Sequence, residues 1–87
     1  MAHLIVEQIF DPPLTDEEHG RLGQLLDKCL EMHGARWERS FLSSDRRRMV
    51  CEFTAPDAEA VRSSFRSAGI RFERVWAAEM YTRQVSV

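Results

Sequence analysis

The fold of this chain is decided by WERSFLSSDRRRMVCEF, residues 37–53, followed by APDAEAVRSSFRSAG, residues 55–69. The first part has the pattern of two strands joined by a polar turn. In its second strand Met49, Cys51 and Phe53 share one face, and Arg48, Val50 and Glu52 share the other. The second part predicts a helix that begins at Pro56 and ends at Gly69.

The segments on either side complete a second, similar half. Residues 3–10 (HLIVEQIF) predict a strand that ends before two prolines. A capping box of Thr15 and Glu18 then predicts a helix that ends at Gly34. For Gly20 and Gly23 within this helix we expect close packing against the sheet, with a mobile first turn as the alternative. The apolar stripe of the helix comprises Leu22, Leu25, Leu26, Cys29, Leu30 and His33.

Residues 72–81 predict the last strand, and residues 82–87 a loose tail. The order strand, helix, strand, strand, helix, strand predicts an α+β fold of the ferredoxin-like βαββαβ class. In this plait two helices cover one face of a four-stranded antiparallel sheet, and the other face stays open. Residues 1–87 are expected to form a single domain of this kind, with the first and third strands central.

Composition limits the function. The chain has 87 residues, a net charge of −2 and 44% apolar residues. This charge does not favour nucleic acid as a partner, and no segment has the apolar length of a membrane span. Because no signal peptide is visible, and because two cysteines are too few for a disulfide framework, we expect a cytoplasmic protein. A domain this small has a thin core, which favours a homodimer.

Most residues whose side chains could bind a metal or react have an ordinary structural explanation. His3, His19 and His33 do not share one face, so their spacing predicts no metal site. Cys29 and Cys51 fall at apolar positions and are expected in the core. The cluster of arginines at residues 46–48 is expected to be a solvated turn, with an anion contact as the alternative.

The open face of the sheet is the candidate site. Glu7 lies in the body of a central strand, and Glu52 faces the same way from its neighbour. Two carboxylates across adjacent strands repel each other, and a bound cation, an arginine or a shared proton would relieve this repulsion. We expect Glu7 and Glu52 to hold a metal ion or small ligand, with Ser40, Arg74 and Trp76 in support. The alternative is a solvated face, or a dimer with compensating Arg–Glu pairs.

The chain resembles the DUF4242 or nickel-binding-protein-like family of small bacterial proteins. The resemblance rests on WERS at residues 37–40, the polar turn, the cysteine of the third strand and APDAEAV at residues 55–61. It implies a dimeric ferredoxin-like protein, and in some members nickel bound by histidines of the first strand and second helix. The matching positions here are Glu7 and Phe65, which implies weak or absent nickel binding.

No catalytic motif is present, so catalytic residues stay unassigned and an enzyme is not the favoured interpretation. The favoured function is a homodimer that binds a metal ion or small ligand at or beside the open face. One alternative is a small enzyme of the dimeric α+β barrel type, which an apolar pocket with a lone polar group would favour. The other is a structural or regulatory interaction module, which a flat surface would favour.

Overall fold

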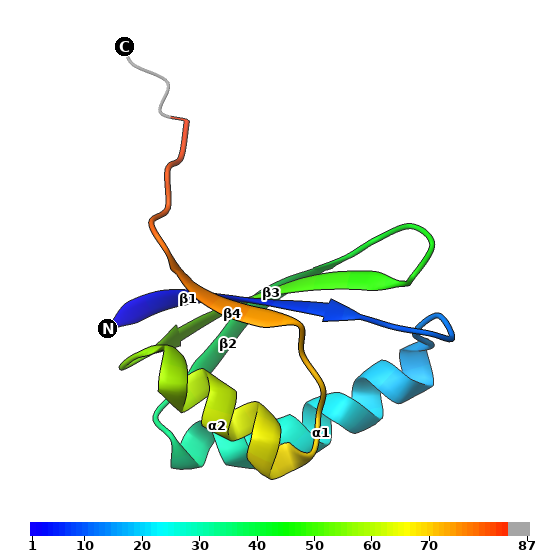
Figure 1. Ribbon diagram of the computed structural model, residues 1–87, viewed down its shortest axis with the longest axis horizontal. Helices are drawn as coiled ribbons and strands as arrows, with labels where there is room; N and C mark the ends of the chain where they lie inside the picture. The colour runs from blue at the N-terminus through cyan, green and yellow to red at the C-terminus, as the bar shows by residue number, and fades with distance from the viewer. Residues whose placement is uncertain (84–87) are drawn as a thin grey trace.

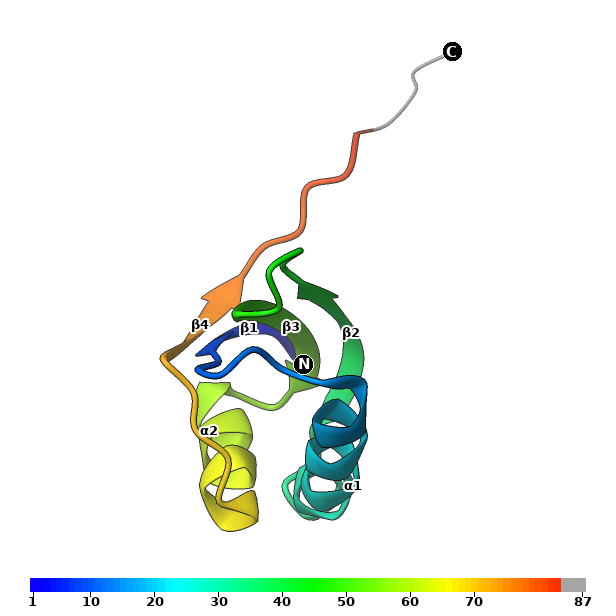
Figure 2. The ribbon, with the colours of Figure 1, turned by 90° about the vertical axis from the view of Figure 1, so that its right-hand side faces the viewer.

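The computed structural model of this chain describes residues 1–83. Four strands form one antiparallel sheet in the order β2-β3-β1-β4, and both helices cover the same face of it (Figures 1 and 2). The predicted βαββαβ plait is therefore confirmed, with the first and third strands at its centre. The elements are β1 Ala2–Ile9, α1 Asp16–Met32, β2 Arg36–Leu42, β3 Arg48–Ala55, α2 Ala58–Ala68 and β4 Arg74–Ala78.

Helix α1 begins and ends near the residues that the sequence indicates. The Thr15 side chain accepts a hydrogen bond from the Glu18 backbone N–H at 3.1 Å. The Glu18 carboxylate does not reach back, because it accepts from the Arg21 guanidinium at 2.6 Å; only half of the capping box forms. The chain leaves the helix through His33 and Gly34, and the φ of 68° at Gly34 is one that glycine adopts without strain.

The two glycines inside α1 are not packed against anything. A Cβ atom placed on Gly20 or Gly23 would meet no heavy atom within 4 Å. The predicted close packing of these glycines against the sheet is therefore wrong. Leu25, predicted within the apolar stripe, is 44% exposed and lies outside the core.

Helix α2 begins later than the sequence predicts. The Asp57 side chain accepts from the Ala60 N–H at 2.8 Å and caps the helix, so its first residue is Ala58 rather than Pro56. The helix ends, as predicted, at Gly69 in the left-handed conformation. Short polar side chains cap a helix well because they satisfy N–H groups that have no partner within it.

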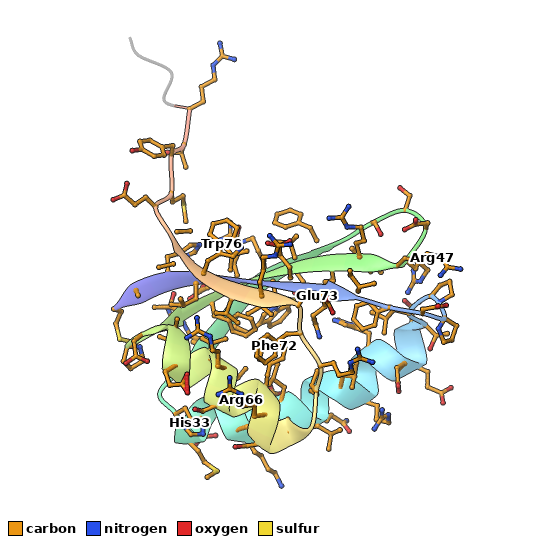
Figure 3. The ribbon with its side chains drawn as sticks, viewed as in Figure 1. His33, Arg47, Arg66, Phe72, Glu73 and Trp76 are labelled. Carbon is orange, nitrogen blue, oxygen red and sulfur yellow. The ribbon has the colours of Figure 1, made fainter. Side chains whose placement is uncertain are left out.

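The core lies between the sheet and the helices. Phe65 of α2 packs edge-on against Phe53 of β3 and against Phe72, with 5.7 Å between ring centroids in each case. Figure 3 shows Phe72 on the helix side of the sheet, below β4. Val61, on the same side of this helix, is also fully buried.

Strand β2 contains a β-bulge that the sequence does not reveal. Trp37 pairs with Phe53 and Arg39 pairs with the next residue, Glu52, so Glu38 is an extra residue without a partner of its own. A bulge shifts the alternation of side chains by one from that point on. Trp37, Ser40 and Leu42 consequently share the helix side of the sheet.

Strand β4 is shorter than the predicted segment of residues 72–81, since it covers only Arg74–Ala78. Residues 79–83 leave the sheet on the side away from the helices (Figures 1 and 2). Of the predicted loose tail, residues 84–87 lie outside the described residues. Among residues 1–83 no helix has both the length and the apolar character needed to cross a membrane.

Candidate functional site

The open face, meaning the side of the sheet away from the helices, carries both predicted carboxylates. Ladder partners share a face, so the pairs Glu7–Arg74 and Ile5–Trp76 join β1 to β4 on this side. Figure 3 shows Trp76 above the sheet, opposite the helices. The face is formed by His3, Ile5, Glu7, Ile9, Arg36, Glu38, Arg39, Phe41, Arg48, Val50, Glu52, Thr54, Arg74, Trp76 and Ala78.

Glu7 already has two partners on β4. The indole N–H of Trp76 donates to Glu7 Oε2 at 2.8 Å, and Arg74 Nε lies 3.5 Å from the same oxygen. The predicted grouping of Glu7, Arg74 and Trp76 on one surface is thus what the structure contains. An arginine beside a half-buried carboxylate offsets its charge.

Glu52 is the more deeply placed carboxylate. Its side chain is 18% exposed, and its Oε1 atom lies 3.3 Å from Arg39 Nε and 4.0 Å from His3 Nε2. Oε1 is buried and accepts no hydrogen bond among the described residues. The ion pair with Arg39 compensates its charge, although the contact does not have hydrogen-bond geometry.

The two carboxylates are diagonal neighbours rather than direct partners. Glu7 is opposite Val50, and Glu52 is opposite Ile5. Diagonal side chains across two strands are about 7–8 Å apart at their backbones. Since each carboxylate has its own arginine, the arrangement matches compensating Arg–Glu pairs, the alternative considered for this face, and no cation is required.

Ser40 does not belong to this site. The register pairs it with Cys51, and its hydroxyl donates to Cys51 Sγ at 3.0 Å on the helix side of the sheet. Unbroken alternation along the strand predicts Ser40 on the open face, and this prediction is wrong because of the bulge. Because Glu38 is the bulge residue, it keeps to the open face, where its carboxylate accepts from Thr54 Oγ1 at 2.8 Å. The hydrogen bond from Thr54, and then that from Arg36, lower the pKa of Glu38.

No described residues provide a ready metal centre. Within residues 1–83 no three side chains of His, Cys, Asp or Glu come close enough to hold one ion. The two positions that the family resemblance matches to nickel ligands also lie apart. Glu7 is on the open face, whereas Phe65 is 1% exposed in the core beneath the sheet.

The arginine cluster of the β2–β3 turn is engaged by acidic groups. Arg46 Nε donates to the Leu14 carbonyl and its Nη2 to Asp16 Oδ1, both at 2.5 Å. Arg47 Nη1 lies 3.2 Å from Asp11 Oδ1. These contacts tie the turn to the segment before α1, which favours the structural explanation of a turn over an anion site.

A second candidate site, which the sequence does not indicate, lies on the helix side of the sheet. An open cavity of about 170 Å³ lies between α1, α2 and the sheet, and its lining is almost entirely apolar. Its buried walls include Leu30, Met49, Phe53, Phe65 and Ile70. The exposed residues in its lining are His19, Gly23, Asp27 and Trp37, which places its opening between α1 and β2.

A chain of polar side chains runs along this cavity. The Trp37 indole N–H donates to Ser40 Oγ at 2.9 Å, and Ser40 donates in turn to Cys51. The Cys51 thiol donates to Gln8 Oε1 at 3.8 Å, and Gln8 Nε2 donates to the Arg71 carbonyl at 3.1 Å. Gln8 is the residue that the sequence could have flagged, because it interrupts the inward-facing series of Leu4 and Val6.

Cys51 is buried, as the sequence predicts. Burial raises the pKa of the Cys51 thiol, and the hydrogen bond from Ser40 opposes this only in part. The thiol is therefore kept protonated at neutral pH. A reactive cysteine needs the opposite environment, one that is electropositive and partly exposed.

Fold and site together define a class, a ferredoxin-like α+β domain with one covered and one open sheet face. A family model described as nickel responsive protein SCO4226-like matches residues 3–77, and the chain belongs to this family. The DUF4242 label of the sequence analysis stays a prediction. The fold is similar to that in "Crystal structure analysis of SCO4226 from Streptomyces coelicolor A3(2)", with a TM-score of 0.83 and 16% identity over 93% of this chain and 100% of that one. Among curated proteins, none matches this chain.

Proposed function

We propose that this protein forms a homodimer through the open face and binds a small ligand, rather than acting as an enzyme. One observation carries the dimer. Four large apolar side chains are exposed on the open face, between carboxylates that are already ion-paired; they are Ile9, Phe41, Val50 and Trp76. An apolar surface of this kind is typical of protein–protein contacts.

The pairing of charges on the open face supports the same proposal. Covering an unpaired carboxylate with a second protein is costly, because the charge loses its water. Glu7 and Glu52 each have an arginine within the same chain, so a partner can cover them without supplying a counter-charge. Two identical faces related by a twofold axis are the commonest arrangement in homo-oligomers.

A divalent cation is the less favoured ligand. The family description names nickel, and Glu7 and Glu52 are the oxygen ligands proposed for such an ion on the open face. Two carboxylates with arginine partners are poor metal ligands, since Arg74 and Arg39 compete with any cation. Nickel also prefers imidazole nitrogen, which neither residue offers.

The enzyme alternative has one supporting observation, the apolar cavity with few polar groups and with His19 in its lining. The titratable side chain inside the cavity, Cys51, has a pKa raised by burial. That direction disfavours a nucleophile, so we propose binding without chemistry. We propose that the protein is located in the cytoplasm, and two free thiols, Cys29 and Cys51, support this. We propose no nucleic-acid partner.

Sedimentation velocity at tens of micromolar tests the dimer. The variant Phe41→Glu replaces a side chain that is 60% exposed on the open face, and it is expected to sediment as a monomer. The matched control is Met32→Glu, which makes the same kind of change at an apolar residue that is 78% exposed at the end of α1. The control is expected to stay dimeric.

A wild-type protein that sediments as a monomer overturns the dimer proposal. Dissociation of both variants alike would place the contact elsewhere and would also overturn it. Circular dichroism of each variant confirms that the sedimentation result reports association rather than unfolding.

A further inference from the structure

The cavity on the helix side has the size of a small ring. Its volume of about 170 Å³ is close to that of an engineered apolar cavity of about 150 Å³ that binds benzene. Three exposed residues of α1 spaced four apart, His19, Gly23 and Asp27, lie at its rim. No side chain projects from the middle of this row, because residue 23 is glycine.

One end of the cavity carries a buried hydrogen-bond acceptor with spare capacity. Gln8 is 6% exposed and lines the cavity from the central strand β1. Among residues 1–83, the partner of its Oε1 atom is the Cys51 thiol at 3.8 Å. A thiol is a weak donor, whereas an amide oxygen has two lone pairs. A hydroxyl group that reaches this oxygen would satisfy it better than the thiol does.

The charge of the lining selects a neutral molecule. No lysine or arginine is among the residues that line the cavity, and the carboxylate at its rim is Asp27. An anion within the apolar walls would lose its water without meeting a lysine or an arginine, and it would pass Asp27 as well as His19 at the rim. The wall residue Trp37 presents an aromatic ring at the opening, and aromatic rings stack edge-on or offset on one another.

From this size, acceptor and charge, we propose that the cavity binds a neutral single-ring aromatic molecule with one hydroxyl group, a simple phenol. The ring lies among the apolar walls, and the hydroxyl donates to Gln8 Oε1. This inference deepens the proposed small-ligand function and rests on it, but it places the ligand beneath the sheet rather than at the open face.

The test uses phenol, toluene and benzoate as probes. Trp76 lies on the opposite face of the sheet, so in a Trp76→Phe background the fluorescence of Trp37 reports the cavity alone. Phenol is expected to give a saturable change, and toluene to bind about tenfold more weakly because it lacks the hydroxyl. Benzoate is expected to give no change. Absence of saturable phenol binding, or equal binding of the three probes, overturns the proposal.

The chain offers a matched pair of blocking variants. Gly23→Leu places a side chain at the rim of the cavity, while Gly20→Leu makes the same change one turn earlier on α1, outside the lining. Neither new Cβ atom meets a heavy atom within 4 Å, so both variants are expected to fold. Phenol binding is expected to fall at least about tenfold in Gly23→Leu and to be unchanged in Gly20→Leu. Equal behaviour of the two variants places the binding elsewhere and overturns the proposal.

Gln8→Met tests the hydroxyl contact separately. It is expected to remove the preference for phenol over toluene while leaving toluene binding intact; a retained preference overturns the role of Gln8. Sedimentation of the same samples separates the two proposals. A monomer that binds phenol contradicts only the dimer, and a dimer that ignores phenol contradicts only this inference.

Discussion

Each of the two predicted carboxylates on the open face, Glu7 and Glu52, has an arginine of its own. Glu7 pairs with Arg74 across β1 and β4, and Glu52 pairs with Arg39 across β3 and β2. The sequence predicts two carboxylates that repel each other, with a bound cation, an arginine or a shared proton to relieve the repulsion. Because cross-strand arginines relieve it within the chain, the strain itself is no argument for a ligand.

Cys51 is a buried thiol, and burial raises its pKa. We expect iodoacetamide to modify Cys51 in the native protein only at a higher pH than in urea, whereas the half-buried Cys29 reacts first. Mass spectrometry of the alkylated peptides measures the two rates. Equal rates for the two thiols would contradict the buried position of Cys51.

The raised pKa of Cys51 also predicts how the free energy of unfolding changes at alkaline pH. A thiol whose pKa is higher in the folded than in the unfolded chain stabilises the fold below the unfolded value of about 8.5. That stabilisation is lost as the pH rises through the folded pKa. In Cys51→Ala the free energy of unfolding should therefore fall less steeply above about pH 8.5 than in the wild type. The cavity left by the substitution lowers the free energy of unfolding of the variant by the same amount at every pH, so it does not change the slope with pH.

At the scale of elements, helix α1 would be more stable with alanine in place of its internal glycines. Glycine within a helix costs about 1 kcal/mol relative to alanine, and a Cβ atom at Gly20 would meet nothing within 4 Å. We expect Gly20→Ala to raise the free energy of unfolding by about 0.5–1 kcal/mol in urea denaturation.

Gly34→Ala is the control for this prediction. Its φ of 68° lies in the left-handed region, so an alanine there is strained and is expected to lower stability. A lower stability for Gly20→Ala as well would mean that residue 20 is not in an open helical position.

Local signals explain why the elements could be predicted and the site could not. Thr15 and Gly69 act within a few residues of the chain, so the sequence shows them. The bulge at Glu38 has no glycine or proline to mark it, and the face assigned to Ser40 was wrong for that reason. The cavity depends on how α1 packs against β2 and β3, and that packing leaves no local pattern.

At the scale of the whole molecule, the sheet separates the two positions that the family resemblance matches to nickel ligands. Glu7 lies above the sheet and Phe65 beneath it, so one chain cannot bring them to one ion. We expect calorimetry with chelator-free protein to show weak or absent nickel uptake.

His3→Ala and Glu52→Gln serve as controls, because these two residues form the histidine–carboxylate contact of the open face. Weak uptake should be the same in both variants and in the wild type. Tight uptake of one nickel ion per chain, abolished by Glu52→Gln, would contradict this and would support the carboxylates as metal ligands.

The extra residue in β2 keeps Trp37 on the helix side of the sheet. If the strand kept Glu38 but paired without a bulge, Glu38 would lie opposite Phe53 and residues 36–37 would move by one place, which would turn Trp37 outward and Arg36 inward. The cavity would lose its aromatic wall, and the outer surface would gain an indole in place of a charge. Loss of the bulge would therefore alter the cavity and the open face together, whereas deletion of Glu38 itself would leave Trp37 opposite Phe53 and both faces as they are.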